Sequence, residues 1–282
     1  MKGDRALIHR AASVLEQGST HTLDLAREVL CLTGNPGAAS AAVFTLLGAD
    51  SRFRVDSEGL WSLEGPRPGT PLAELRYAVV DVETTGGPYR RGHRITEVAI
   101  YEVRDGVVAD GYRTLVNPGR GIPPRIAALT GITNDMVSSA PYFDHIASDV
   151  LERLQDRVFV AHNARFDWGF VSQQLAEAIG EVPRVERLCT VGMARRILPR
   201  LRRRNLDALA RHFDIGITAR HRAHGDALAT ARVLLRLLDE AGNLGLTDLE
   251  SLKAFLRKRR RPSRPRQGQQ LSLLGPSPDG VW

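Results

Sequence analysis

The chain has 282 residues, of which 43% are hydrophobic and 25% are charged, and this composition argues against a collagen, a coiled coil or wholesale disorder. No apolar run is long enough to span a membrane, and the first residues do not form a signal peptide. The two cysteines, Cys31 and Cys189, are too few for a disulfide framework or a cysteine-based zinc site. We therefore expect a cytoplasmic protein with no membrane partner.

The net charge of +7 is concentrated near the end of the sequence. Residues 1–66 hold six basic and eight acidic residues, whereas residues 253–282 hold eight basic residues and one acidic residue. The latter segment also loses apolar periodicity and gains Pro, Gln and Ser, so we expect residues 253–282 to form a disordered basic tail. Such a tail binds polyanions in general, and the alternative is a solvated tail without a ligand.

Three helices and a hairpin are predicted within residues 1–64. Apolar residues recur at helical spacing over 6–15 and 23–30, and Pro36 begins an Ala-rich helix. Residues 53–55 and 60–63 alternate around a turn, which is typical of a hairpin. The whole segment resembles a small winged-helix domain. Because its third helix has no Lys or Arg over residues 37–44, we favour protein contact over the reading of a DNA groove.

An α/β domain is predicted over residues 73–244, after a linker rich in Pro and Gly over residues 65–72. Strands are expected at 77–83, 95–103, 107–116 and 158–161, and helices at 166–179, 191–198, 205–212 and 223–240. Strands that come first and then alternate with helices indicate an α/β fold with a mixed sheet.

The strongest chemical signal is the run from Asp81 to Gly86, Asp-Val-Glu-Thr-Thr-Gly, at the end of the first of these strands. Residues i and i+2 of a strand point to the same face, so Asp81 and Glu83 direct two carboxylates into one space. Two anions this close repel each other unless a cation lies between them, and Mg²⁺ or Mn²⁺ suits oxygen ligands. The alternative is that Asp81 only begins a polar loop.

Two further acids stand at the starts of helices. Asp167 ends the run His162-Asn163-Ala164-Arg165-Phe166-Asp167, directly after the predicted strand at 158–161. Asp226 ends the run His221-Arg222-Ala223-His224-Gly225-Asp226, which leads into the helix at 223–240. Asp167 would also be favourable there simply as a complement to the helix dipole.

Together the three runs resemble the DEDDh 3′→5′ exonucleases, the family of the proofreading epsilon subunit of bacterial replicative DNA polymerase. The resemblance covers roughly residues 75–240 and includes Asp-x-Glu with Thr-Thr-Gly, His-Asn-Ala-x-Phe-Asp and His-x-x-x-x-Asp, in that order. It implies a ribonuclease H-like fold with a five-stranded mixed sheet flanked by helices.

The resemblance also implies the roles of individual residues. Two divalent metal ions, Mg²⁺ or Mn²⁺, would be held by four carboxylates, those of Asp81, Glu83, Asp167 and Asp226. His221 would be the general base, because it stands five residues before Asp226, whereas His224 stands only two before it. The terminal nucleotide would leave as a 5′-monophosphate. We expect its pocket to be formed by Thr84, Thr85, His162, Asn163 and Phe166, and the alternative for Phe166 is a structural role.

A second resemblance lies in the tail, at Gln270-Leu271-Ser272-Leu273-Leu274. A Gln followed by spaced apolar residues is similar to the short peptide with which bacterial replication and repair proteins bind the sliding clamp. The matching positions are Gln270, Leu271, Leu273 and Leu274, although the family usually prefers Phe where Leu274 stands. The implied partners are DNA and either the sliding clamp or a polymerase subunit.

We therefore predict a metal-dependent exonuclease that acts on DNA, in proofreading or repair. One alternative is an exoribonuclease of the same family, since the sequence does not separate ribose from deoxyribose. The clamp-like peptide favours DNA. Another alternative is a non-catalytic DNA-tethering module associated with a clamp, which the complete set of acids argues against.

Overall fold

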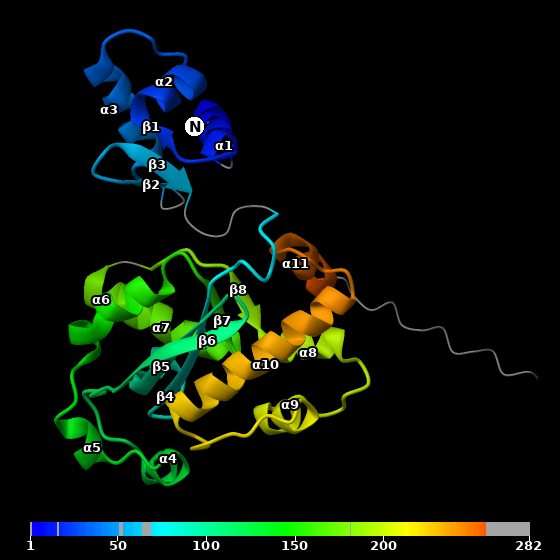
Figure 1. Ribbon diagram of the computed structural model, residues 1–282. Helices are drawn as coiled ribbons and strands as arrows, with labels where there is room; N and C mark the ends of the chain where they lie inside the picture. The colour runs from blue at the N-terminus through cyan, green and yellow to red at the C-terminus, as the bar shows by residue number, and fades with distance from the viewer. Residues whose placement is uncertain (1, 16, 51–52, 64–68, 181, 258–282) are drawn as a thin grey trace, which may run out of the picture.

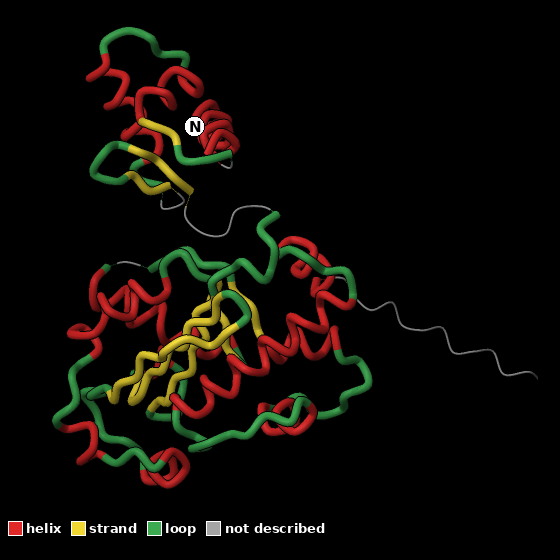
Figure 2. The backbone as a smooth tube through the Cα atoms, viewed as in Figure 1, coloured by secondary structure: helices red, strands yellow, loops and turns green. Residues whose placement is uncertain are grey.

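The computed structural model describes residues 2–15, 17–50, 53–63, 69–180 and 182–257 (Figures 1 and 2). The described residues fall into an N-terminal unit, residues 2–63, and a larger unit, residues 69–257. None of the helices within these ranges is long and apolar enough to cross a membrane.

The N-terminal unit packs three helices against a small sheet. Its elements are α1 (Lys2–Leu15), β1 (Thr20–His21), α2 (Thr22–Leu30), α3 (Pro36–Leu47), β2 (Phe53–Val55) and β3 (Leu60–Leu63), with the strands in the antiparallel order β1-β3-β2. Trp61 of β3 is buried among the helices, and its indole Nε1 donates a hydrogen bond to Thr22 Oγ1 at 3.0 Å. The three predicted helices and the hairpin are confirmed, whereas the winged-helix assignment stays a prediction.

The larger unit is built on a five-stranded mixed sheet, as predicted. Its strands are β4 (Tyr77–Thr84), β5 (Ile95–Arg104), β6 (Val107–Leu115), β7 (Val158–Ala161) and β8 (Arg187–Cys189), in the order β6-β5-β4-β7-β8. The β6-β5-β4 half is antiparallel, and β4-β7-β8 is parallel. The central strand β4 is thus paired on both edges, which explains its nearly continuous apolar run.

Alternate residues of β4 are buried in two separate cores. Tyr77 and Val79 face a core that contains residues of α8 (Thr190–Ile197), α9 (Leu206–His212), α10 (Ala223–Asn243) and α11 (Leu249–Arg257). Ala78 and Val80 face the opposite core, which contains residues of α6 (Phe143–Leu154) and α7 (Ala164–Ile179). The sheet is therefore the middle layer of three, as Figure 1 shows.

Three short elements near the end of β4 were not predicted from the sequence. They are the 3₁₀ turn η1 (Tyr89–Arg91) and the helices α4 (Pro124–Thr130) and α5 (Asn134–Ser138). Helix α4 begins at a proline and ends at Gly131, and its Ile126 packs with Ile122, Ile132 and Val137 in a small core of its own.

The structure corrects two predicted boundaries. Leu72 is buried, and its backbone N–H donates to Thr247 O at 2.8 Å beside a bridge between Pro71 and Asp248, so these residues belong to the larger unit and not to a linker that ends at 72. The tail does not begin at 253, because α11 continues to Arg257 and buries Leu252 against the core. Residues 258–282 lie outside the described residues.

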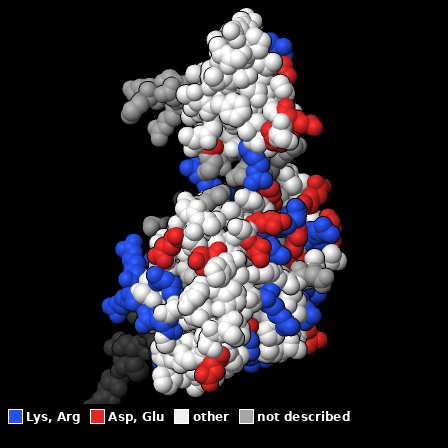
Figure 3. All heavy atoms as spheres, turned by 90° about the vertical axis from the view of Figure 1, so that its left-hand side faces the viewer, with Lys and Arg blue, Asp and Glu red and all other residues white. Residues whose placement is uncertain are grey.

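The described surface carries charge of both signs. Figure 3 shows the side on which α5 and α6 lie in Figure 1, where Lys and Arg side chains gather at the left-hand edge of the larger unit while acidic and basic side chains intermix elsewhere. Positive charge is therefore present on the folded unit as well as in the C-terminal tail.

Candidate active site

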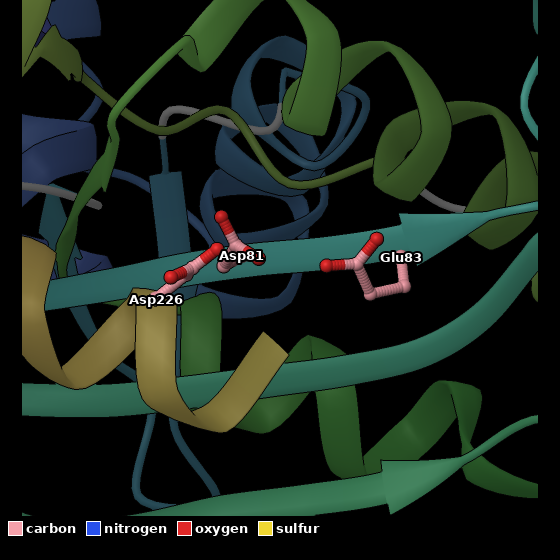
Figure 4. Close-up of side chains that lie close together, drawn as sticks. All are labelled: Asp81, Glu83 and Asp226. Carbon is pink, nitrogen blue, oxygen red and sulfur yellow. The ribbon is translucent and has the colours of Figure 1, made fainter. Parts of the chain in front are cut away.

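The carboxylates of Asp81, Glu83 and Asp226 converge at the polar end of β4. Asp81 and Glu83 project from the same face of the strand, and Asp226 reaches them from the first turn of α10 (Figure 4). One carboxylate oxygen from each residue lies within 4.8 Å of the others. The two carboxylates of the strand and the acid of the helix thus lie close together in the structure.

Asp167 approaches the same end of β4 from the first turn of α7. Its side chain is 4% exposed, and its Oδ1 accepts a hydrogen bond from the backbone N–H of Val82 at 3.3 Å. Val82 lies between Asp81 and Glu83, so Asp167 contacts the backbone of the segment that carries the two strand carboxylates. The structure therefore clusters three of the four predicted acids and bonds the fourth, Asp167, to the strand that carries two of them.

Burial and mutual repulsion make these acids hard to ionise. Burial is the main cause in every case. It raises the pKa of Asp81 well above its usual range, with further contributions from the neighbouring carboxylates, and raises the pKa of Glu83 to about 8. The pKa of Asp167 is raised to about 7, and that of Asp226 is also raised. A site of this kind favours bound cations, which would stabilise the ionised form.

The donor set fits a hard divalent cation. It consists of carboxylate oxygens, which Mg²⁺ and Mn²⁺ prefer. In addition, Asp226 Oδ1 is buried and accepts no hydrogen bond from any described residue. A buried carboxylate oxygen without a partner is costly, and a metal ion would satisfy it.

Arg220 is a cation at this site that the sequence analysis missed. Its guanidinium pairs with Asp226 and donates from Nε to Asp207 Oδ1 at 2.9 Å. Its charge also acts to lower the pKa values of Asp81 and Glu83, but burial raises them by more. Arg220 therefore offsets part of the negative charge of the cluster, and no local pattern around residue 220 distinguishes it from other surface arginines.

His221 lies in a tight turn directly before α10. Its φ of 60° is left-handed, its backbone N–H donates to Asp226 Oδ2 at 3.3 Å, and its Nδ1 is 3.5 Å from Arg220 Nη1. His224 instead lies within α10, with its Nδ1 3.8 Å from Glu97 Oε1. The structure thus places His221 beside the acid cluster and His224 beside a different carboxylate.

The predicted substrate-contacting threonines are buried and bonded within their own loop. Thr84 Oγ1 accepts from the backbone N–H of Gly86 at 3.2 Å. Thr85 is fully buried, its Oγ1 lies 2.9 Å from His93 Nδ1, and its backbone N–H donates to Arg94 O at 3.0 Å. The described contacts of Thr84 and Thr85 therefore hold the loop after β4 in place.

The other predicted substrate residues surround the start of α7. His162 Nδ1 lies 2.9 Å from Thr190 Oγ1, and burial lowers the pKa of His162 to about 4. Asn163 is the exposed N-cap of α7, and Phe166 is 41% exposed with its ring 5.1 Å from that of Phe170. An exposed aromatic ring in the first turn of α7, one residue before Asp167 in the sequence, is suited to stacking on a base.

One part of the predicted site, the clamp-like peptide with Gln270, Leu271, Leu273 and Leu274, lies outside the described residues.

A buried acid close to the site, Glu97, was not predicted, although a charged residue inside the apolar run of β5 is an unusual signal.

The five-stranded sheet with carboxylates gathered at the end of its central strand defines an α/β protein with a ribonuclease H-like exonuclease fold. The sequence model of the Exonuclease family (RNase_T) matches residues 78–234, and the chain belongs to this family.

Several known proteins are similar to this chain. A Mycobacterium tuberculosis protein whose name calls it a putative bifunctional exonuclease/endonuclease is 39% identical over 198 residues, 68% of this chain and 31% of that protein. The 3′-5′ exonuclease DinG of Bacillus subtilis is 34% identical over 64% of this chain and 20% of its own length. The chain thus spans about a third or less of these two relatives.

Two further proteins are matched over most of their length. The DNA polymerase III subunit epsilon of Aquifex aeolicus is 33% identical over 64% of this chain and 90% of that subunit. The solved structure of exonuclease X in complex with 5′-overhanging duplex DNA is 26% identical, with a TM-score of 0.51 over 64% of this chain and 99% of that one. These relatives support nuclease activity for the chain.

Proposed function

We propose that the protein is a 3′→5′ exonuclease that removes terminal nucleotides from DNA with the help of Mg²⁺ or Mn²⁺. The observation that carries the proposal is the convergence of Asp81, Glu83 and Asp226 within 4.8 Å, with Asp167 bonded to the same strand. Three carboxylates from two separate elements converge, and a fourth acid, from a third element, is bonded to the strand between them, which a structural role alone does not require.

The proposed reaction is hydrolysis of the last phosphodiester bond. Bound divalent ions would supply charge neutralisation and an acidified water, and Asp81, Glu83, Asp167 and Asp226 would hold them. The oxygen of a water attacks phosphorus, the bond to the 3′ oxygen of the preceding nucleotide breaks, and a nucleoside 5′-monophosphate leaves. His221 accepts the proton of the attacking water, and the departing 3′ oxygen takes up a proton to become a hydroxyl group.

The terminal nucleotide would be held by residues around the start of α7. Phe166 presents an exposed ring on which a base can stack, and Asn163 presents an exposed amide one turn before Asp167. Thr84, Thr85 and His162 would shape the floor of this pocket through the internal contacts described above.

DNA is the proposed substrate, either as a single strand or as a mismatched 3′ end. The names of the epsilon subunit and of exonuclease X in complex with duplex DNA support this choice. An exoribonuclease is the second candidate, since a pocket distinguishes RNA by its 2′-hydroxyl. The proposed setting is proofreading or repair.

Matched digestion of three substrates tests this proposal. Purified full-length protein with Mg²⁺ or Mn²⁺ should shorten 5′-labelled single-stranded DNA stepwise, shorten mismatched duplex DNA from its 3′ end, and act less on RNA of the same sequence. Faster digestion of the RNA would identify an exoribonuclease. If none of the three substrates is digested, the exonuclease proposal is wrong and the alternative of a non-catalytic DNA-tethering module is favoured.

We further propose that residues 1–64 form a winged-helix-like domain for protein contact and that the tail binds a sliding clamp or polymerase subunit. The net acidic composition of residues 1–66 and the peptide Gln270–Leu274 support these assignments. The full chain should bind a bacterial sliding clamp in a biosensor assay, and replacing Gln270 and Leu273 with Ala should abolish the signal. Equal binding by that variant would exclude the peptide as the contact.

A further inference from the structure

Glu97 is a buried carboxylate that the proposed reaction does not use. It lies on β5, directly opposite Glu83 in the pairing of β4 with β5, and is 3% exposed. A charge this deep in a sheet is unfavourable unless it is both paired and hydrogen-bonded. The surroundings of Glu97 therefore have to supply a cation and several donors.

All of the described hydrogen-bond partners of Glu97 come from the start of α10. Arg222 donates from Nε to Glu97 Oε2 at 3.0 Å and from Nη2 to Oε1 at 2.9 Å, which is a bidentate ion pair. The backbone N–H of Ala223 donates to Oε2 at 3.0 Å. We refer to Glu97 and Arg222 together as the helix clamp.

The clamp also caps α10. Arg222 is the N-cap residue of this helix, and its own side chain makes no capping hydrogen bond. Glu97 accepts the N–H of Ala223 in its place, and its negative charge complements the positive end of the helix. The start of α10 is thus held by a carboxylate from the sheet, although a helix usually takes its cap from its own sequence.

The helix half of the clamp, Arg222, lies between two residues of the candidate active site in the sequence. His221 directly precedes Arg222, and Asp226 follows Ala223 within the first turn of α10. The backbone N–H of His221 donates to Asp226 Oδ2 at 3.3 Å, so the two residues are in direct contact. Since β5 is paired with β4, and α10 packs on both strands, the clamp connects the strand that carries Asp81 to the helix that carries Asp226.

Given the proposed exonuclease function, we propose that Glu97 and Arg222 are positioning residues that set where Asp226 and His221 lie relative to the carboxylates of β4. The clamp does not touch the substrate or the reacting atoms. It fixes the distance between Asp226 and the carboxylates of β4. The affinity of the site for a divalent ion depends on this distance.

Binding of Mn²⁺ alone to the metal-free protein tests the clamp without relying on catalysis. The variants are Glu97→Gln, which keeps the shape but removes the charge, and Arg222→Lys, which keeps the charge but loses the bidentate bond. We expect each to weaken Mn²⁺ binding, measured by calorimetry, by about 10-fold to 100-fold. The kcat on single-stranded DNA should fall by a similar factor, with KM within about twofold of wild type.

Glu102→Gln is the matched control. Glu102 lies on the same strand, and its carboxylate pairs with Arg76 at 2.6 Å and Arg157 at 3.3 Å, away from α10. This variant should melt at a lower temperature than wild type, since it also loses an ion pair of β5, yet should bind Mn²⁺ with wild-type affinity.

The proposal is overturned if Glu97→Gln and Arg222→Lys are folded, by circular dichroism, and bind Mn²⁺ within about twofold of wild type. If Glu97→Gln does not fold, the result for Arg222→Lys decides. Wild-type protein that binds Mn²⁺ but digests no nucleic acid would disprove the proposed function, while the comparison of Mn²⁺ affinities would still test the clamp.

Discussion

At the scale of single residues, Asp81 is the most crowded group of the site. Burial, Asp167, Glu83 and Asp226 all raise its pKa, and only Arg220 among the named neighbours lowers it. Burying a carboxyl group among other carboxyl groups lowers the stability of the metal-free fold. A loss of stability of this kind is typical of functional sites.

Replacing Asp81 with Asn should therefore change activity and stability in opposite directions. We expect Asp81→Asn to lower kcat/KM about 10³-fold or more, because a ligand to the proposed ions is lost. In EDTA near pH 8 the same variant should melt at a higher temperature than wild type, because repulsion within the cluster is relieved. A variant that is both active and less stable would contradict this account of the site.

The raised pKa values also predict how the stability of the metal-free protein depends on pH. The pKa of Glu83 is about 8 and that of Asp167 about 7 in the folded state, both above their ordinary values. The folded state then binds more protons than the unfolded state. The contribution of these two acids to the free energy of unfolding is therefore fully present below about pH 4 and is lost as pH rises through about 7 to 8.

The melting temperature of the metal-free protein, measured in EDTA, should therefore fall as pH rises. Between about pH 5.5 and pH 8 the melting temperature should fall, and added Mg²⁺ should restore more of it at pH 8 than at pH 5.5, because the ion binds the ionised form. A melting temperature in EDTA that rises over this interval would mean that the acids are not held as described.

The two histidines near Asp226 should differ sharply in their effect on turnover. We expect His221→Ala to lower kcat by about 10² to 10⁴-fold if His221 is the general base. His224→Ala is the comparison and should cost less, because the carboxylate that His224 approaches is Glu97, at 3.8 Å, and not one of the proposed metal ligands. Single-turnover rates on single-stranded DNA would compare the two, and a larger loss in His224→Ala would reverse the assignment.

At the scale of elements, the start of α10 depends on a glycine. A Cβ on Gly225 would overlap the backbone carbonyl oxygens of Thr218 and Ala219, in the loop that leads to His221. The loop therefore lies directly against the first turn of the helix, and only glycine leaves room for it.

Gly225→Ala should accordingly displace this loop. We expect a loss of about 1–3 kcal/mol in the free energy of unfolding and a fall in kcat, because His221 moves with the loop. Gly242→Ala in the same helix is the control, since nothing lies within 4 Å of a Cβ there, and it should be neutral or slightly stabilising. Urea unfolding of both variants measures the difference, and equal stability would contradict the close approach.

Most of the elements could be predicted because their patterns are local. The apolar run of β4 and the helical period of α10 are visible in the sequence, and they place Asp81, Glu83 and Asp226 at element ends. Helix α6 was not predicted, although Phe143, Ile146 and Val150 recur at helical spacing.

The site contacts that were missed depend on tertiary structure. Glu97 meets Arg222 across 125 positions of sequence, and Arg220 reaches Asp226 only because the loop before α10 folds back in a left-handed turn at Ala219 and His221. Periodicity reports which face of an element is buried, but it does not report which distant side chain lies opposite.

At the scale of the whole molecule, the candidate active site lies entirely within the larger unit. The N-terminal unit has its own core around Trp61, and ion pairs such as Arg54–Asp156 at 3.6 Å and Arg184–Asp50 at 3.4 Å join the two units. Exposed ion pairs contribute little to stability, about 0–1 kcal/mol each.

Removal of residues 1–68 should therefore leave the exonuclease reaction and the melting temperature of the larger unit nearly unchanged. Removal of residues 1–75 is the informative comparison, because it also takes away Leu72 and Leu75, which are buried in the core beside α10 and α11. We expect this longer deletion to lower the melting temperature clearly, since burying a Leu side chain contributes about 1.5–3 kcal/mol. Equal stability of the two deletions would show that Leu72 and Leu75 do not hold the fold.

The bridge between Pro71 and Asp248 has a consequence for how this fold is built into larger polypeptides. The segment that leads into the first strand and the segment that leads into the last helix are one hydrogen bond apart, at Leu72 and Thr247. Only the nine-residue helix α11 follows this bridge within the unit, so the chain enters and leaves the unit on the same side, as Figure 1 shows. A module of this kind is suited to insertion into a surface loop of a host protein.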